Sequence, residues 1–155
     1  MPKLFDRRRL LRLVSLYVPY LGAGIRVRVS PDYHTFEVRM KLRWYNRNYV
    51  GTHFGGSLYS MCDPFFMLIL LDALGREYIV WDKAATIRFR RPGKGTVRAT
   101  FHIPPERVEE IRAAADRDGK VEPTFRVDVV DDKGEVVAEV EKLLYVRRKD
   151  AAPLS

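Results

Sequence analysis

The stretch from residue 55 to residue 74 constrains the fold more than any other part of the chain, because it is helical in composition and apolar on nearly every side. A helix of this kind is stable in water only when the rest of the chain encloses it. Segments that alternate apolar and polar residues lie on both sides of it, as expected for strands with one buried face. These segments are 25–29, 35–42, 78–90, 97–103, 124–130 and 136–146. The sequence therefore predicts an α+β fold in which a curved antiparallel sheet wraps around one central helix.

One domain accounts for the whole chain. A length of 155 residues is enough to bury roughly two thirds of the surface that the unfolded chain exposes. A second amphipathic helix is predicted over 104–117, where apolar residues share one face. We expect residues 1–149 to form the domain, with residues 1–22 as an extra N-terminal helix packed on it, and residues 150–155 to be a disordered tail.

The predicted N-terminal helix carries arginines ahead of apolar residues. Leu10, Leu13, Val14 and Tyr17 recur at helical spacing. This pattern favours a helix that packs these side chains on the domain and leaves its arginines in water. A helix that lies on a membrane surface is the less favoured interpretation, because the apolar face is modest. The apolar run 65–71 is too short to span a bilayer.

The net charge of +8 is unevenly distributed along the chain. Residues 1–30 carry +6 and residues 76–103 carry +5, whereas residues 104–142 carry −5. Such segregation favours an anionic partner on one surface, and a phosphorylated small molecule fits as well as nucleic acid. No nucleic-acid-binding motif accompanies the basic residues, so nucleic acid is the less favoured partner.

The cysteine and histidine content predicts neither a disulfide nor a metal site. The single Cys62 excludes an intrachain disulfide and agrees with a cytoplasmic location. The three histidines are not at metal-ligand spacing, and we expect no cofactor.

The segment from Asn48 to Asp63 holds most of the functional information. The Gly55-Gly56 pair lets the backbone approach a ligand closely, and the free N–H groups at a helix start can hold an oxyanion. Asp63 lies at the edge of an apolar stretch, where an unpaired carboxylate would be costly. The segment therefore predicts an anion-binding backbone and one reactive carboxylate.

The same residues carry a resemblance to a known family. Asn48, the Gly-Gly pair and Asp63, with the segment 87–95, resemble the motif and the following strand and turn of the phenylacetyl-CoA-thioesterase-like branch of the hotdog superfamily. The variants Thr-His-Phe-Gly-Gly at 52–56 and Asp-Pro at 63–64 resemble a poorly characterised subgroup known only as a domain of unknown function. The resemblance covers about residues 24 to 147. It implies a hotdog homodimer or homotetramer that hydrolyses acyl-coenzyme A thioesters.

The resemblance also implies roles for individual residues. The Gly55 N–H would hold the oxyanion, Asp63 would activate water or attack the thioester carbonyl, and Asn48 would orient the carboxylate or the water. Gly56 and His53 would contact the substrate. The chain departs from the family at two points. The family's histidine directly before the first glycine is replaced by Phe at position 54, and the family's hydroxyl on the next strand falls near position 82.

Helix geometry predicts that two subunits share the site. If Gly55 and Asp63 lie on one helix, about 12 Å separates them along its axis. A general base must lie within about 3 Å of the atom that it serves. Antiparallel helices of two subunits would bring Gly55 of one chain beside Asp63 of the other, so the site requires a homodimer.

Each candidate also has a purely structural interpretation. Asp63 followed by proline matches a helix N-cap, the glycine pair matches a tight turn, and Asn48 matches a loop residue that bonds its own backbone. The basic run Arg88, Arg90, Arg91 and Lys94 is either the solvated face of an edge strand or the contact for coenzyme A phosphates.

Three functions follow from these residues, in order of preference. The first is an acyl-CoA thioesterase. The second is a non-catalytic hotdog protein that binds acyl-CoA or acyl chains. The third is a basic protein that binds nucleic acid or an anionic membrane and uses the core only as a scaffold.

Overall fold

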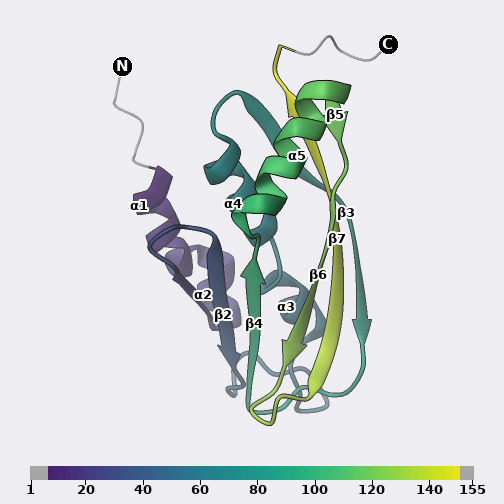
Figure 1. Ribbon diagram of the computed structural model, residues 1–155. Helices are drawn as coiled ribbons and strands as arrows, with labels where there is room; N and C mark the ends of the chain where they lie inside the picture. The colour runs from purple at the N-terminus through teal and green to yellow at the C-terminus, as the bar shows by residue number, and fades with distance from the viewer. Residues whose placement is uncertain (1–6, 151–155) are drawn as a thin grey trace.

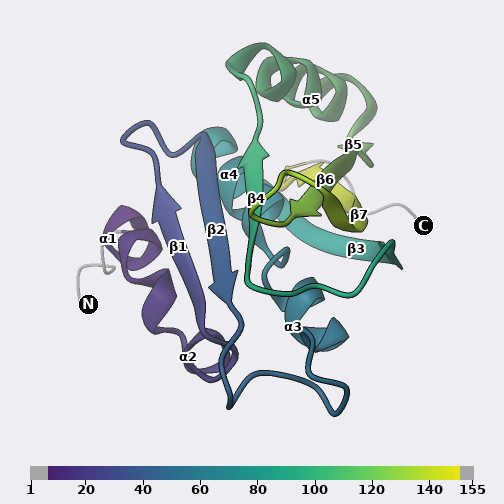
Figure 2. The same cartoon turned by 90° about the horizontal axis from the view of Figure 1, so that it is seen from below.

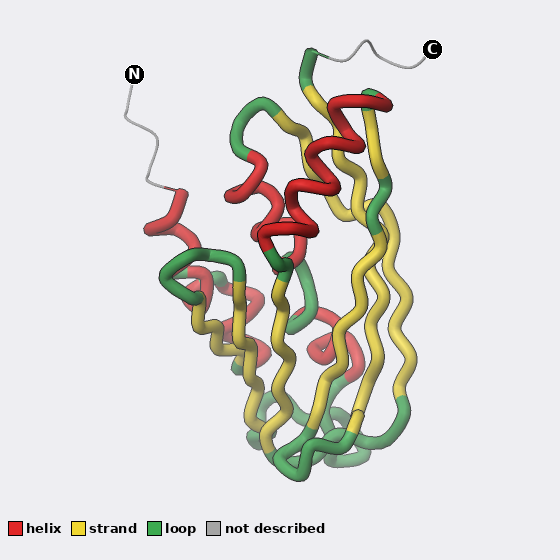
Figure 3. Tube along the Cα trace, viewed as in Figure 1, coloured by secondary structure: helices red, strands yellow, loops and turns green. Residues whose placement is uncertain are grey.

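The structure, a computed structural model, describes residues 7 to 150 (Figures 1 and 3). Its helices are α1 (Arg7–Arg12), the 3-10 helix η1 (Val14–Leu16), α2 (Val18–Ala23), α3 (Gly55–Ser60), α4 (Phe65–Leu74) and α5 (Pro105–Asp118). Its strands are β1 (Ile25–Val29), β2 (Thr35–Lys41), β3 (Tyr78–Phe89), β4 (Thr96–His102), β5 (Lys120–Val121), β6 (Thr124–Val130) and β7 (Val136–Arg148).

The strands form one antiparallel sheet that curves around α3 and α4 (Figure 2). The order is β1-β2-β4-β6-β7-β3, and the short β5 pairs with β7. Helix α4 fills the concave side, where the ring of Phe65 lies 5.4 Å from that of Phe36 and 4.9 Å from that of Phe101. The predicted α+β fold, a sheet wrapped around a central helix, is confirmed.

The central helix is not continuous, and this corrects the prediction of one helix over 55–74. Residues 61–64 interrupt it and separate α3 from α4. The stretch Gly55–Leu74 is long and apolar enough to cross a membrane, with a mean hydropathy of 1.4, but half of it is buried inside the protein. The sheet that surrounds α4 explains its composition, because a core helix needs the same apolar residues as a membrane span.

The N-terminal segment also differs from the prediction. Three short helices, α1, η1 and α2, replace the single helix expected over 1–22, whose first six residues lie outside the described ones. Leu13 and Tyr17 are exposed, contrary to the expected packing, while Leu11, Val14 and Tyr20 contact the core. The expected tail lies outside the described residues, apart from residue 150.

Ser15 attaches this segment to the free edge of β1. Its hydroxyl accepts a hydrogen bond from the Val27 N–H at 2.8 Å and donates one to the Val27 carbonyl at 3.2 Å. One side chain thus satisfies two backbone groups that an edge strand would otherwise leave unpaired.

Strand β3 contains a bulge at Lys83. Asp82 is opposite Leu144 of β7 and Ala84 is opposite Leu143, so Lys83 has no partner of its own. Bulges of this kind bend a strand and re-aim its side chains. Here the bulge directly follows Asp82.

Candidate active site

Asp63 lies in the turn between α3 and α4, and its side chain does not cap a helix. Pro64 occupies the N-cap position of α4, and no side chain bonds the first turn. The Asp63 Oδ1 atom instead accepts a hydrogen bond from the Lys142 ammonium at 2.6 Å. The structure therefore does not support the N-cap interpretation of Asp63.

Lys142 is the centre of a charged cluster beneath this turn. It lies on β7 at an inward-facing position, and its side chain is 1% exposed. Its Nζ atom contacts Asp63 Oδ1 at 2.6 Å, Asp82 Oδ2 at 3.1 Å and the Tyr59 hydroxyl at 3.1 Å. Ala85 is the cross-strand partner of Lys142 on β3. Two carboxylates and one buried cation thus meet at the wall of the core.

The two carboxylates have different environments. The Asp63 side chain is 43% exposed, whereas that of Asp82 is 19% exposed. Burial raises the pKa of the Asp82 carboxyl, the Lys142 charge lowers it, and the neighbouring Asp63 raises it, with a raised value as the outcome. The Asp82 Oδ1 atom is buried and has no hydrogen-bond partner. Asp63 therefore faces solvent as an accessible carboxylate, while the buried Asp82 has a pKa above the usual value for an aspartate.

The hydrogen bonds of Lys142 and one further residue, Tyr20, hold the cluster in place. Burial alone would lower the pKa of Lys142, but its hydrogen bonds to Asp63 and Tyr59 outweigh that effect and raise it. Lys142 therefore stays protonated. The Tyr20 hydroxyl of α2 donates a hydrogen bond to the Asp63 carbonyl, which fixes the backbone of the turn. Burial, followed by the Asp63 charge, raises the pKa of Tyr20, so this phenol remains a donor.

The glycine pair begins α3, as predicted. Phe54 is the N-cap residue and provides no side-chain bond, so the first N–H groups of α3 have no side-chain cap. A Cβ atom at Gly55 would lie 3.0 Å from the ring of Phe89, and one at Gly56 would lie 2.6 Å from the ring of Phe54. Only glycine permits these close approaches without movement of the rings.

Asn48 and His53 organise the loop ahead of α3. The Asn48 side chain donates to the Thr52 hydroxyl at 2.9 Å and accepts from the Thr52 N–H at 2.9 Å. The His53 ring is buried, and its Nε2 atom lies 3.0 Å from the Gly95 carbonyl. Burial lowers the pKa of His53. Within one chain these bonds match the loop interpretation of Asn48 and keep His53 away from solvent.

The predicted phosphate-binding residues lie at the end of β3 and in the loop after it. Arg90 pairs with Glu139 at 2.6 Å, and Arg91 pairs with Glu135 at 2.6 Å. Arg88 and Lys94 are exposed. All four are at the surface, but Arg90 and Arg91 already form ion pairs within the chain.

Sequence reasoning missed two site residues, Lys142 and Tyr59. It considered Asp82 only as the position where the family has a hydroxyl. One signal pointed to Lys142, because the alternation of β7 places Val140, Lys142 and Leu144 on the same buried side. A lysine is almost never fully buried without an ionic partner. A lysine at this position therefore predicts a carboxylate partner from another helix or strand.

The fold is that of the hotdog thioesterases. The chain is similar to a Pseudomonas aeruginosa protein of unknown function described as a probable thioesterase, with 26% identity, a TM-score of 0.79, and coverage of 93% of this chain and 97% of that one. It is also similar to a Haemophilus influenzae thioesterase, with 13% identity, a TM-score of 0.64 and coverage of 98% and 97%. The Escherichia coli PaaI protein, from the phenylacetic acid degradation operon, gives 18% identity, a TM-score of 0.59 and coverage of 96% and 98%.

A family model matches residues 6–146 of the chain. The chain belongs to the family described as a domain of unknown function, DUF4442. No curated protein matches the sequence. The resemblance found in the sequence, to a hotdog subgroup of unknown function, is therefore confirmed.

Proposed function

We propose that the protein is an acyl-CoA thioesterase in which Asp63 is the catalytic carboxylate. The observation that carries the proposal is the position of Asp63 at the carboxylate position of the thioesterase motif, partly exposed and held at 2.6 Å by a buried ammonium. Tyr20 bonds its backbone carbonyl and Lys142 bonds its side chain. A carboxylate oriented in this way is prepared to act without further reorganisation.

The reaction has two steps in this proposal. Asp63 accepts a proton from water as the water oxygen attacks the thioester carbonyl, and the tetrahedral oxyanion accepts a hydrogen bond from the Gly55 N–H of the partner subunit. The intermediate then collapses, the carbon–sulfur bond breaks, and the coenzyme A thiolate leaves. Direct attack by Asp63 on the carbonyl, followed by hydrolysis of the anhydride, is the covalent form of the same proposal.

The edge strand β3 supports a dimer as the active form. It is twelve residues long and pairs only with β7 among the described strands, so its outer edge has no partner in residues 7–150. Proteins seldom leave an edge of this length open. Pairing of β3 with β3 of a second copy would join the two sheets and bring the two central helices together.

Hydrolysis assays over a panel of acyl-CoAs, with a reagent that detects the released thiol, test the proposal. Asp63→Asn should lower the rate at least about a hundredfold, as expected for loss of a general base. Circular dichroism and the melting temperature must show that the variant remains folded. A fall in activity that only follows a fall in stability would assign Asp63 a structural role.

Non-catalytic binding of acyl-CoA is the second candidate, and one observation favours it. Lys142 already contacts Asp63 Oδ1 at 2.6 Å, so this oxygen is engaged in an ion pair rather than open to a water molecule. Titration calorimetry that detects acyl-CoA binding, together with the absence of thiol release from every substrate, would establish this function.

A subunit-mixing experiment tests whether Gly55 and Asp63 act across the dimer. Gly55→Pro removes the N–H at the first position of α3, a helix position whose backbone suits proline, although the Phe89 ring must move to admit the added side chain. Gly55→Ala is the matched control, because it adds a similar side chain but keeps the N–H. Mixed Gly55→Pro and Asp63→Asn subunits should recover roughly a quarter of the wild-type activity, since half of randomly assorted dimers have one intact site. If hybrids form and activity does not return, either both groups act within one chain or one of them is not catalytic.

A further inference from the structure

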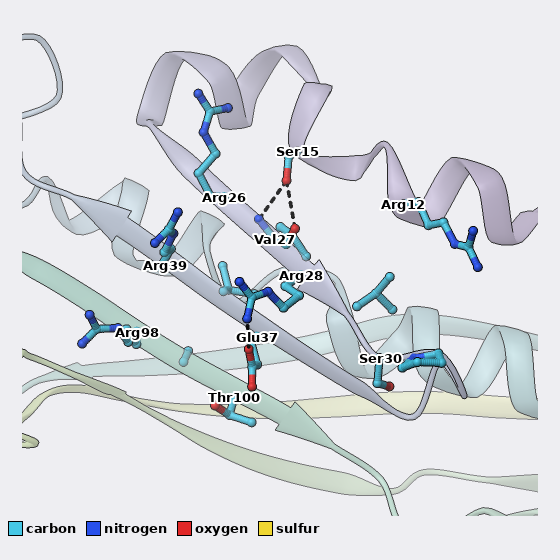
Figure 4. Close-up of a pocket in the computed structure, with 14 residues that line it drawn as sticks. Arg12, Ser15, Arg26, Val27, Arg28, Ser30, Glu37, Arg39, Arg98 and Thr100 are labelled. Carbon is cyan, nitrogen blue, oxygen red and sulfur yellow. Dashed lines mark hydrogen bonds and ion pairs between the residues drawn. The ribbon is translucent and has the colours of Figure 1, made fainter.

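Five arginines gather around a groove on the outer face of the sheet (Figure 4). The groove has a volume of about 840 Å³ and lies between the N-terminal segment and the strands β1, β2 and β4. The arginines come from four elements: Arg12 from α1, Arg26 and Arg28 from β1, Arg39 from β2, and Arg98 from β4. This face of the sheet is opposite the one that covers α4 and the Lys142 cluster.

Three of these arginines form a row across adjacent strands. Arg26 is the cross-strand partner of Arg39, and Arg39 is the partner of Arg98. Like charges directly opposite each other destabilise a sheet. Asp132 pairs with Arg98 at 2.9 Å, but neither Arg26 nor Arg39 forms an ion pair among the described residues. The sheet therefore keeps an unneutralised pair of guanidinium groups at a cost to its own stability.

Exposed apolar side chains directly follow two groove residues in the chain. Arg12 and Ser15 line the groove, and the residues that follow them, Leu13 and Leu16, are exposed. Leu16 is 60% exposed, and Val18, two residues further, is 76% exposed. Tyr17 and Leu21 extend the same exposed apolar segment, which we call the apolar rim (residues 13, 16, 17, 18 and 21).

We propose that the arginine groove and the apolar rim dock the protein on an anionic lipid bilayer. Guanidinium groups bind phosphate headgroups, and neighbouring aliphatic side chains enter the boundary between headgroups and acyl chains. From the sequence alone, a packed N-terminal helix was favoured over one that lies on a membrane surface. The two surfaces together reverse that order. The proposal goes beyond thioester hydrolysis, and it needs no residue of the Lys142 cluster.

Two other occupants fit the surface less well. A second copy of the chain, related by a two-fold axis through the groove, would bring the arginine row against itself. Single-stranded nucleic acid is held by aromatic side chains that stack on its bases, and no aromatic residue lines the groove. A bilayer alone uses both the positive charge and the exposed aliphatic groups.

Sedimentation with lipid vesicles tests the proposal. The protein should bind vesicles that contain phosphatidylglycerol and not vesicles of phosphatidylcholine alone. Arg26→Gln with Arg39→Gln should lower the partition coefficient about 25-fold, because each arginine near an anionic surface contributes about fivefold. The matched control is Arg107→Gln with Arg117→Gln, which removes the same charge from exposed positions on α5 and should change binding far less.

The apolar rim has its own test. Leu16→Ser with Val18→Ser should weaken the vesicle binding that remains at high salt, where charge attraction is screened. Absence of binding, equal binding to both kinds of vesicle, or an equal loss in the α5 control would overturn the proposal. A change of oligomeric state in the Leu16/Val18 variant without loss of vesicle binding would also overturn it. So would binding to DNA that is tighter than binding to vesicles and is unchanged in this variant.

Discussion

Substitution of Lys142 by methionine should destabilise the protein through the two carboxylates that it leaves behind. Methionine has a similar length and fits the buried position, so the main change is the loss of the ammonium that contacts Asp63 at 2.6 Å and Asp82 at 3.1 Å. Removal of one member of a buried ion pair costs about 3–5 kcal/mol. Asp63 is 43% exposed, so water screens it partly, and we expect the lower end, about 3 kcal/mol at neutral pH.

The loss should depend on pH, and its sign follows from Asp82. The pKa of Asp82 is raised in the folded protein by burial, and Lys142 opposes the rise. A group with a raised folded pKa contributes stability that is complete below its unfolded pKa and disappears as the pH rises through its folded pKa. Without Lys142 that folded pKa is higher, so the variant loses more at pH 7 than at pH 5. Where the folded variant binds one proton more than the folded wild type, the difference in free energy of unfolding between the two proteins decreases by about 1.4 kcal/mol for each unit that the pH falls.

Urea denaturation of both proteins at pH 7 and pH 5 measures this effect. The double variant Lys142→Met with Asp82→Asn is the control, because it removes the buried carboxylate together with its cation and should recover much of the stability. A loss below about 1 kcal/mol, within the range of exposed ion pairs, would refute the reasoning. An equal loss at both pH values would also refute it.

Two further predictions concern buried titratable side chains. Burial raises the pKa of the Cys62 thiol to about 12, so native protein should react with a thiol reagent at pH 8 only on the timescale of unfolding, and urea should abolish the protection. Burial lowers the pKa of His53, so the unfolded state binds its proton first and stability should fall as the pH drops below about 6.5. His53→Asn should flatten that decline, as followed by the urea midpoint from pH 7 to pH 5; an unchanged slope would mean that other groups cause it.

Much of the fold was predictable from the sequence because alternation and apolar composition report burial directly. β1 and β6 begin and end where the alternation predicted. The break between α3 and α4 was not predictable in this way, since residues on both sides of it are apolar. Asp-Pro at 63–64 was interpreted as a helix start, but α4 begins one residue after the proline, without a side-chain cap.

The site was predictable only in part. Asp63 and Gly55 were selected by local spacing, which one segment of sequence contains. Lys142 is 79 positions away from Asp63, and only the folded sheet brings it beneath the turn. The exposure of Leu13 and Tyr17 was missed for a related reason, because helical spacing identifies an apolar face but not the kinks that turn it away from the core.

The extra residue at Lys83 determines which side chains of β3 face inward. Before it the even-numbered side chains face the helices, as at Tyr78 and Asp82. After it the odd-numbered ones do, and Phe89, although 56% exposed, lies against Gly55. Side chains alternate strictly along a regular strand, so no unbulged strand could aim both Asp82 and Phe89 at the helices. Deletion of this one codon would therefore do more than shorten the strand. It would turn the second half of the strand over, so that Phe89 would face away from Gly55 and the even-numbered side chains beyond the deletion would take its place.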